Sequence, residues 1–350
     1  MDFNIVTFHR AYNYGAVLQA YALQSFITQM GYSCSIYDYL SPKENQAIGI
    51  KGKILRAIQM LNKKDCVARE KKYRAFVETA LHLNKETNSK IYISGSDQVW
   101  NPTNGIDSNY FLQFASTDSV KISYAASMGE YTINEEQTDI LRKYLSDFDM
   151  VSVREEHDKQ RLAELCDKEI LVHVDPTLLH DQAFWYQQAC PVEGVPEKYI
   201  LVYLMHWPKN VNKLLTWLKK ETGAKILIVD GQGIIQGITT NLIKHNVAKH
   251  RVAPREFLWL FAHAEYVVTS SFHGTVFSLL FEKEFYAITD PNRASRITNI
   301  LNKVGLQSVS EFAQTFTRNK DIDWRKVETI LKEERQRSKD YLEKAYRAYQ

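Results

Sequence analysis

Residues 265–288 read EYVVTSSFHGTVFSLLFEKEFYAI, and this stretch decides the class of the fold. Two β-branched and aromatic runs, residues 266–269 and 285–288, enclose an apolar pattern with helical spacing at residues 274–281. A strand, a helix and a second strand in this order predict a βαβ unit, in which the helix joins two parallel strands. The polar segment SSFHG, residues 270–274, falls where the first strand gives way to the helix, which makes it a candidate site.

The same alternation of short apolar runs and amphipathic stretches continues on both sides of this unit and predicts an α/β fold with parallel strands. Further strands are expected at residues 3–8, 35–39, 91–94, 121–126, 150–153, 170–174, 199–204 and 224–230. Further helices are expected at residues 15–30, 135–145, 155–165, 211–221 and 254–262.

The rhythm is interrupted at residues 180–199, which hold two prolines and a glycine with little periodicity. We therefore predict a domain boundary there. An N-terminal Rossmann-like domain is expected at residues 1–185 and a C-terminal one at residues 186–322, facing each other across a cleft. Residues 323–350 are charged and helical in pattern. One arrangement open to this segment is a brace across the first domain.

Composition narrows the class of protein. The 350 residues include 45% hydrophobic and 24% charged residues, enough apolar material for a folded core, and a net charge of +3 is too small to predict a nucleic-acid partner. The four cysteines form no C-x-x-C pair and the ten histidines no H-x-x-x-H pair, so we expect neither a metal nor another cofactor. No window approaches the ~20 apolar residues of a membrane span and no signal-peptide pattern is present, which predicts a cytoplasmic protein.

One segment, from Lys51 to Arg74, departs from this mixed surface. Nine Lys and Arg residues stand there against one Asp and one Glu, and apolar residues recur at helical spacing between them. Two interpretations stay open. The segment is either a solvated helix face or a surface for peripheral contact with an anionic membrane or a polyanionic substrate.

Polar residues recur where the predicted strands end. They are Asp97 and Trp100 after the strand at 91–94, Arg154 after 150–153, Asp175 after 170–174, and Ser271, His273 and Gly274 after 266–269. The carboxyl ends of parallel strands converge at one edge of a sheet, so these loops predict a ligand site. Asn13 and Tyr14 stand directly before the first helix, where backbone N–H groups could meet an anion.

Each candidate also has a purely structural interpretation. Asp97 and Asp175 are typical of turns and loop caps. Arg154 could form an ion pair with Glu155 or Asp149.

Six segments, in this order and spacing, together resemble the polysaccharide pyruvyl transferase family: NYGAVLQAYAL, ISGSDQVWNP, YAASMG, SVRE, VDPTLL and SSFHGTVFSLL. The resemblance runs from about Asn4 to about Leu306. It implies two Rossmann-like domains in a GT-B-like arrangement. It also implies transfer of the enolpyruvyl unit of phosphoenolpyruvate onto two hydroxyls of one sugar, which forms a cyclic pyruvate ketal and releases phosphate.

The resemblance also implies roles for single residues. Arg154, on the acceptor side, and His273, on the donor side, are linked to donor binding or catalysis, as is a later basic residue that is either Arg293 or Arg296. Phosphoenolpyruvate brings a carboxylate and a phosphate, and arginines and helix N-termini bind such groups. The remaining expected donor contacts are therefore Ser271, Gly274 and Thr275.

The reaction needs an acid and a base. We predict that His273 protonates the methylene carbon of the donor. Either Asp97 or Asp175 would accept a proton from a sugar hydroxyl, and Asp97 is preferred because Trp100 beside it offers a stacking surface. The expected acceptor contacts are Asn13, Tyr14 and Trp100.

The expected partners are phosphoenolpyruvate and a glycan acceptor in capsule or exopolysaccharide synthesis, with a lipid-linked oligosaccharide as one alternative for the acceptor. Two other functions stay open. A GT-B-type glycosyltransferase would use the same fold to hold a nucleotide sugar. A non-catalytic member would bind a glycan without transfer.

Overall fold

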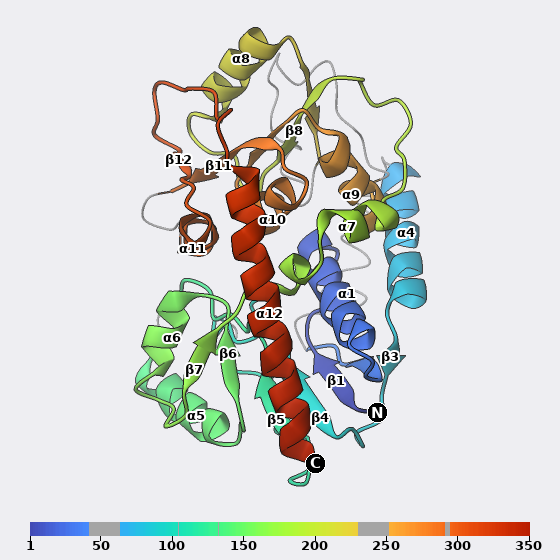
Figure 1. The fold of residues 1–350 in the computed structure, drawn as a ribbon, viewed down its shortest axis with the longest axis vertical. Coiled ribbons are helices and arrows are strands. Elements are labelled where there is room, and N and C mark those ends of the chain that lie inside the picture. Colours follow the sequence, from blue (N-terminus) through green and yellow to red (C-terminus); the bar gives the residue numbers. More distant parts are fainter. Residues whose placement is uncertain (42–63, 104, 132, 230–251, 291–294) are drawn as a thin grey trace. The chain divides into compact units, whose positions relative to one another are not determined.

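The computed structural model describes residues 1–41, 64–103, 105–131, 133–229, 252–290 and 295–350, which form two compact units (Figure 1). Unit 1 comprises the described residues of Met1–Asn62, Arg74–His180 and Leu331–Gln350, and unit 2 those of Lys63–Tyr73 and Asp181–Ile330. Each unit contains its own parallel sheet with connecting helices. The predicted α/β class with two Rossmann-like units is confirmed.

The sheet of unit 1 has the strand order β3-β2-β1-β4-β5, and every neighbouring pair is parallel. Its strands are β1 (Phe3–Val6), β2 (Cys34–Tyr37), β3 (Leu83–Asn84), β4 (Ile91–Ser94) and β5 (Val120–Ser123). A parallel pair, β6 (Val151–Val153) and β7 (Ile170–Val172), continues beyond β5 through isolated bridges. The chain order reverses between β1 and β4, so their carboxyl ends form the topological switch point of a doubly wound sheet.

Helices connect these strands within unit 1. They are α1 (Tyr14–Gln29), α5 (Glu135–Ser146), α6 (Glu156–Leu162) and the 3-10 turn η1 (Pro176–Leu179). Helix α4 (Lys64–Ala80) begins among the residues of unit 2 and ends among those of unit 1. Strands β1 and β4 are buried along their whole length, as expected for parallel strands that helices cover on both faces.

The sheet of unit 2 has the order β12-β11-β10-β8-β9, again with parallel neighbours. Its strands are β8 (Tyr199–Tyr203), β9 (Lys225–Ile228), β10 (Tyr266–Thr269), β11 (Glu284–Thr289) and β12 (Val309–Ser310). Its helices are α7 (Gln182–Gln188), α8 (Val211–Thr222), α9 (Pro254–His263), α10 (Phe272–Leu280) and α11 (Ser295–Lys303). Here the order reverses between β8 and β10, which places the switch point at their carboxyl ends.

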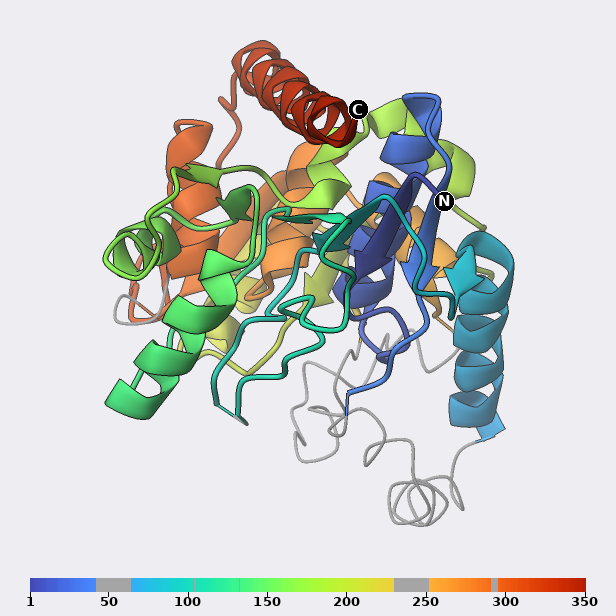
Figure 2. The same ribbon diagram turned by 90° about the horizontal axis from the view of Figure 1, so that it is seen from below.

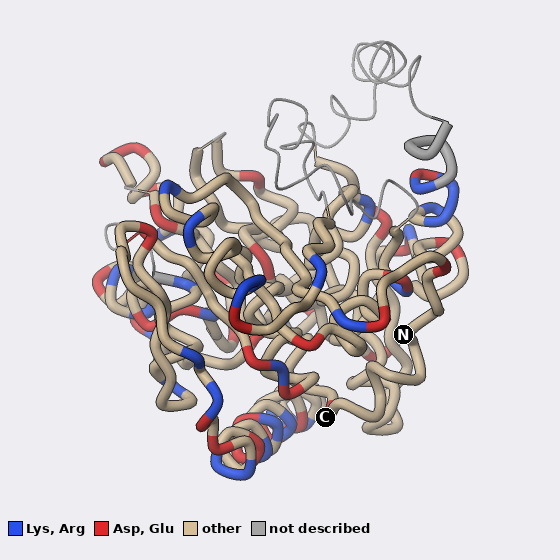
Figure 3. Tube along the Cα trace, turned by 90° about the horizontal axis from the view of Figure 1, so that it is seen from above, with Lys and Arg blue, Asp and Glu red and all other residues tan. Residues whose placement is uncertain are grey.

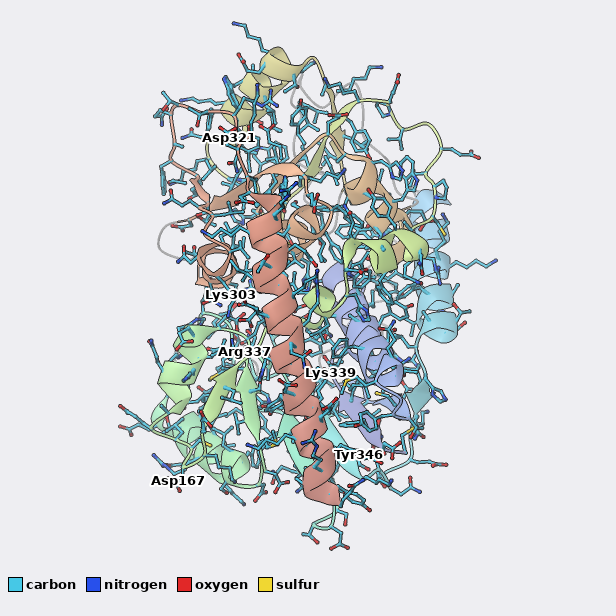
Figure 4. The ribbon with its side chains drawn as sticks, in the orientation of Figure 1. Asp167, Lys303, Asp321, Arg337, Lys339 and Tyr346 are labelled. Atoms are coloured by element: carbon cyan, nitrogen blue, oxygen red, sulfur yellow. The ribbon has the colours of Figure 1, made fainter. Side chains whose placement is uncertain are left out.

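The C-terminal helix α12 (Trp324–Tyr349) braces unit 1, as one arrangement considered for residues 323–350 predicts. The Tyr341 hydroxyl donates to the Ser123 carbonyl at the end of β5 (2.8 Å), and the Tyr124 hydroxyl donates to Ser338 Oγ (3.0 Å). Figure 2 shows α12 on one side of the unit 1 strands, and Figure 4 labels Tyr346 near its end, where the ring packs 4.3 Å from that of Tyr32. Lys, Arg, Asp and Glu are interspersed along the helix (Figure 3).

The structure differs from the sequence expectations in detail. Residues 180–199 contain α7, which the pattern does not predict because Trp185 is the one fully buried residue among its seven and no apolar period develops. Helix α10 begins at Phe272, two residues earlier than predicted, because Ser271 caps it and Gly274 lies inside it. The compact units also differ from the predicted ranges, since residues 63–73 group with unit 2 and residues 331–350 with unit 1.

Candidate functional site

The switch point of unit 1 is tightly packed and polar. A Cβ at Gly95 would lie 2.8 Å from Thr7 Cβ, so the chain after β4 passes the end of β1 at a distance that only glycine allows. The Thr7 hydroxyl donates to the Ser96 carbonyl (2.8 Å) and accepts from the Gln19 side-chain amide of α1 (2.9 Å). These contacts fix the backbone from which residues 96–98 project.

An ion-pair network extends from this point to the end of β6. Arg154 donates from Nη1 to Asp175 Oδ2 (2.9 Å) and from Nε to Glu155 Oε1 (2.7 Å). Asp175 Oδ2 also accepts from the Ser96 hydroxyl (3.1 Å), and its Oδ1 accepts from both the N–H and the hydroxyl of Thr177. The network therefore joins three strand-end loops, as their convergence predicts.

The charge of Arg154 is offset by its surroundings. Its side chain is 3% exposed. Burial by itself lowers the pKa of the guanidinium, but the carboxylates of Glu155, Asp175 and Asp97 outweigh this and raise it. The structural interpretation of Arg154 as the partner of Glu155 is therefore confirmed, and Arg154 also forms an ion pair with Asp175 rather than with Asp149. Arg154 is fixed in orientation; its donor contact stays a prediction.

Asp97 differs from Asp175 in what its carboxylate does. Its backbone lies in the left-handed region (φ 73°), Oδ1 accepts from the Gln98 N–H (2.8 Å), and the residue is half-buried. Asp175 is 1% exposed, and four hydrogen bonds occupy its carboxylate. A carboxylate held by an arginine and three further donors is a weak base, so the structure favours Asp97 of the two candidates.

Trp100 is a core residue in this structure. It is 1% exposed, its ring stacks on Phe111 at 5.0 Å, and its N–H donates to Ser94 Oγ and the Tyr110 carbonyl. A buried indole offers no face to a sugar, so the structure contradicts the prediction of a stacking surface. The sequence misled because a Trp in a strand-end loop has the same signature whether it turns inward or outward.

The other two predicted acceptor contacts lie at the start of α1. Asn13 is its N-cap, and the side-chain oxygen accepts from the N–H groups of Gly15 (2.9 Å) and Ala16 (3.4 Å). Tyr14 is 2% exposed. The N–H groups that could have met an anion are thus already capped by Asn13.

Sequence reasoning missed a second polar cluster in unit 1, after β1 and β2. Arg10 forms a bidentate pair with Asp38 (2.7 and 2.9 Å), and His9 Nε2 lies 3.2 Å from the same carboxylate. These hydrogen bonds from His9 and Arg10 hold the pKa of Asp38 well below its usual range. The signal was present as HR directly after one predicted strand and YDY at the end of the next.

The switch point of unit 2 is built from the SSFHG segment. Thr269 Oγ1 donates to the Tyr203 carbonyl (2.7 Å) and accepts from the Ser271 N–H (3.0 Å), and Ser270 Oγ accepts from the Met205 N–H (3.0 Å). A Cβ at Gly274 would lie 2.1 Å from Thr269 Oγ1, so only glycine lets α10 sit this close to β10. The loop after β10 is thereby bound to the end of β8.

The predicted donor residues of unit 2 surround this junction. Ser271 Oγ accepts from the Gly274 N–H (3.4 Å), and Thr275 donates from its hydroxyl to the Ser271 carbonyl (3.1 Å). His273 lies in the first turn of α10 and is 8% exposed, with its ring 5.2 Å from that of Phe272. Arg296, half-buried, lies in the first turn of α11, whereas Arg293 falls outside the described residues.

Three further expectations concern the surface and metals. Of the basic segment, residues 51–63 lie outside the described residues, and residues 64–74 lie in α4, where Lys72 forms an ion pair with Glu256. Across the described parts of the chain, no helix is long and apolar enough to cross a membrane. Nor do those parts contain a group of three or more His, Cys, Asp and Glu side chains placed to hold a metal ion.

The fold and these clusters define an α/β protein of two Rossmann-like units with polar side chains at the switch point of each sheet. A family model described as polysaccharide pyruvyl transferase matches residues 13–291. Because this match spans most of the chain, the protein belongs to the polysaccharide pyruvyl transferase family. No curated protein sequence matches the chain.

Solved structures are similar at low identity. UDP-GlcNAc 2-epimerase from Neisseria meningitidis, bound to UDP-GlcNAc, is 13% identical with a TM-score of 0.49, covering 100% of this chain and 94% of that one. UDP-GlcNAc 2-epimerase from Methanocaldococcus jannaschii is 11% identical with a TM-score of 0.46, covering 95% and 92%. UDP-N-acetylglucosamine 2-epimerase from Rickettsia bellii is 11% identical with a TM-score of 0.47, covering 94% and 87%.

Proposed function

We propose that the protein is a ketal pyruvyltransferase. It moves the enolpyruvyl unit of phosphoenolpyruvate onto two hydroxyls of a sugar in a polysaccharide or a lipid-linked oligosaccharide precursor, and releases phosphate. The observation that carries this proposal is the family match over residues 13–291. The polar junction between β10 and α10 supports it, because ligands of doubly wound sheets bind at such switch points.

In this proposal the donor binds at the start of α10. The helix N-terminus carries partial positive charge, and Ser271, Gly274 and Thr275 lie there, where the Gly274 N–H and the Thr275 hydroxyl donate to Ser271. Arg296, or Arg293, adds the guanidinium that a phosphate or carboxylate needs. Arg154 is held rigidly by its two carboxylates, so a donor contact by this residue would need no further ordering of the side chain.

The proposed reaction begins with protonation of phosphoenolpyruvate. His273 gives a proton to the methylene carbon, which leaves positive charge on the carbon that carries the phosphate. A sugar hydroxyl forms a bond to that carbon and loses its proton to Asp97. The bond to the phosphate oxygen then breaks, phosphate leaves with the electron pair, and the second hydroxyl closes the ketal with loss of its own proton. One sugar and one phosphoenolpyruvate thus give one ketal and one phosphate.

Asp97 receives the base role because the residue is half-buried and its carboxylate accepts from the Gln98 N–H, whereas the carboxylate of Asp175 accepts four hydrogen bonds. Asn13 and Tyr14, at the start of α1, remain proposed acceptor contacts. If the acceptor is lipid-linked, the segment from Lys51 to Arg74 has a use in peripheral contact with anionic lipid. Loss of liposome binding on neutralising Lys71 and Lys72 would support that use.

The deciding experiment is a phosphate-release assay with phosphoenolpyruvate and pooled free and lipid-linked oligosaccharides. We expect phosphate release that requires an acceptor. A parallel arm offers nucleotide sugars to the same acceptors. Turnover of nucleotide sugars without turnover of phosphoenolpyruvate would replace the proposal with a GT-B-type glycosyltransferase. Glycan binding without turnover of either donor would indicate a non-catalytic member.

A further inference from the structure

Two buried acidic residues near Arg154 have no role in the proposed reaction. Glu155 precedes α6 and Asp158 lies in its first turn, and their side chains are 1% and 0% exposed. Glu155 Oε1 accepts from Arg154 Nε (2.7 Å). Asp158 Oδ2 accepts from the Met128 N–H (2.9 Å), in the loop that follows β5. The pair therefore connects a strand-end arginine to a strand-end loop.

The other oxygen of each acid accepts no hydrogen bond within the described residues, although His157 and Arg161 lie near that of Asp158. These oxygens, Glu155 Oε2 and Asp158 Oδ1, are both buried. Asp158 follows Glu155 by three residues, and its N–H donates to the Glu155 carbonyl (3.1 Å), a spacing that places the two side chains next to each other on one face of the turn. Two ionised carboxylates in this position would repel each other and leave both oxygens unsatisfied. One proton between them removes the repulsion and serves both oxygens.

The charges around Asp158 agree with a retained proton. Burial, followed by the negative charge of Glu155, raises its pKa to about 8, and the Met128 N–H and Arg161 oppose this shift only in part. His157 Nε2 (3.2 Å) and Arg161 Nη1 (3.6 Å) face Asp158 Oδ1 from α6 itself. Arg154 faces Glu155, and Asp175 and Asp97 act on that arginine from the other strand-end loops. One retained proton would leave the pair with a single negative charge beside Arg154.

We propose that Glu155 and Asp158 share one proton, and that Asp158 is thereby a positioning residue for the strand-end cluster of unit 1. Through Glu155 it fixes the orientation of Arg154, and through the Met128 N–H it holds the loop at residues 127–129. When the proton leaves, a second negative charge enters the buried pair, and Arg154 and the loop lose their fixed geometry. The consequence for turnover rests on the proposed function; the shared proton does not.

The first test is thermal unfolding of the full chain at several pH values, with no substrate. A raised folded-state pKa gives stability that is fully present below about pH 4, the unfolded range of Asp, and is lost progressively as the pH rises to about 8. We expect the melting temperature of the wild type to fall by about 3 °C or more between about pH 5 and pH 9, relative to Asp158→Asn. The asparagine amide still donates to Glu155, and its carbonyl oxygen still accepts from Met128.

The matched control is Glu156→Gln, which removes an exposed acid from the same turn of α6 and should keep the wild-type pH dependence. If Asp158→Asn does not fold, Glu155→Gln serves instead, because its amide nitrogen can donate to Asp158 while its oxygen accepts from Arg154. Equal pH dependence in the wild type and the folded pair variant would overturn the shared proton.

The second test measures kcat/KM for phosphoenolpyruvate across the same pH range. The wild type should lose activity above about pH 8. Asp158→Asn should keep its activity both below and above this pH. The same fall in activity in the variant as in the wild type would overturn the positioning role. If no variant releases phosphate, the proposed function fails, but the unfolding experiment still decides whether the proton is shared.

Discussion

Arg154 donates to Asp175 across 2.9 Å, and both side chains are at most 3% exposed, so the end of β6 and the loop after β7 are joined by a buried ion pair. Asp175 also accepts a hydrogen bond from the Ser96 hydroxyl, in the loop after β4. A single carboxylate thus gathers groups from three strand ends. Replacing a member of this network should therefore change stability as well as any activity that depends on Arg154.

Replacing Arg154 should destabilise unit 1. Arg154→Ala leaves the buried carboxylates of Glu155 and Asp175 without their cation, which we expect to cost about 3–5 kcal/mol in the free energy of unfolding by urea. A loss of activity in this variant is therefore no proof of donor contact. Arg142→Ala, which removes an exposed arginine paired with Asp139, should change stability by less than about 1 kcal/mol. Equal effects of the two substitutions would contradict the buried network.

His273 should be required for turnover. His273→Ala is expected to lower kcat in the phosphate-release assay by at least about 10²-fold, since a general acid contributes 10²–10⁴-fold. His263→Gln, at an exposed histidine at the end of α9 in the same unit, is the control and should keep its rate. Near-normal turnover of a folded His273→Ala variant would remove the acid role.

The two acids proposed as bases should behave differently. Asp97→Asn keeps a side chain that tolerates the left-handed backbone, so we expect lost turnover with stability within about 1 kcal/mol of wild type. Asp175→Asn weakens the pair with Arg154 and should cost about 3 kcal/mol or more. Both kcat and urea midpoints are measured. Full activity in Asp97→Asn would exclude it as the base.

Gly274 should be irreplaceable for steric reasons. Gly274→Ala brings a Cβ to 2.1 Å from Thr269 Oγ1, whose hydrogen bonds to Tyr203 and Ser271 prevent it from turning away. We expect a loss of about 1–3 kcal/mol, and Thr269→Ala in the same chain should recover part of it. A double-mutant cycle in urea measures this coupling. Additive effects would show that the clash is relieved elsewhere.

Asp38 should support stability in acid. Its depressed pKa means that it contributes stability above about pH 4, its unfolded range, and loses it as the pH falls toward the lower folded-state value. The melting temperature of Asp38→Asn should therefore fall less than that of wild type between about pH 5 and pH 2.5. Asp139→Asn, at an 80% exposed side chain, is the control and should follow wild type.

Much of the fold follows from local pattern. β4 and β10 have the bounds that their apolar runs predict, and most other predicted strands and helices are found with ends shifted by a few residues. Helix α7 and the two-residue strands β3 and β12 are not predicted, because they are too short for an apolar period to develop. Tertiary packing rather than local pattern selects such elements.

The candidate site was predictable only in part. The sequence by itself determined which residues follow the strands, since Asp97, Arg154, Asp175 and His273 all stand at strand ends in the structure. The tertiary structure alone decided what each side chain does there. In the folded protein Trp100 lies in the core, and hydrogen bonds occupy the carboxylate of Asp175. Asp158 accepts from the Met128 N–H, 30 positions away in the chain. Strand order sets these neighbours, and a local pattern carries no information about contacts between residues so far apart in sequence.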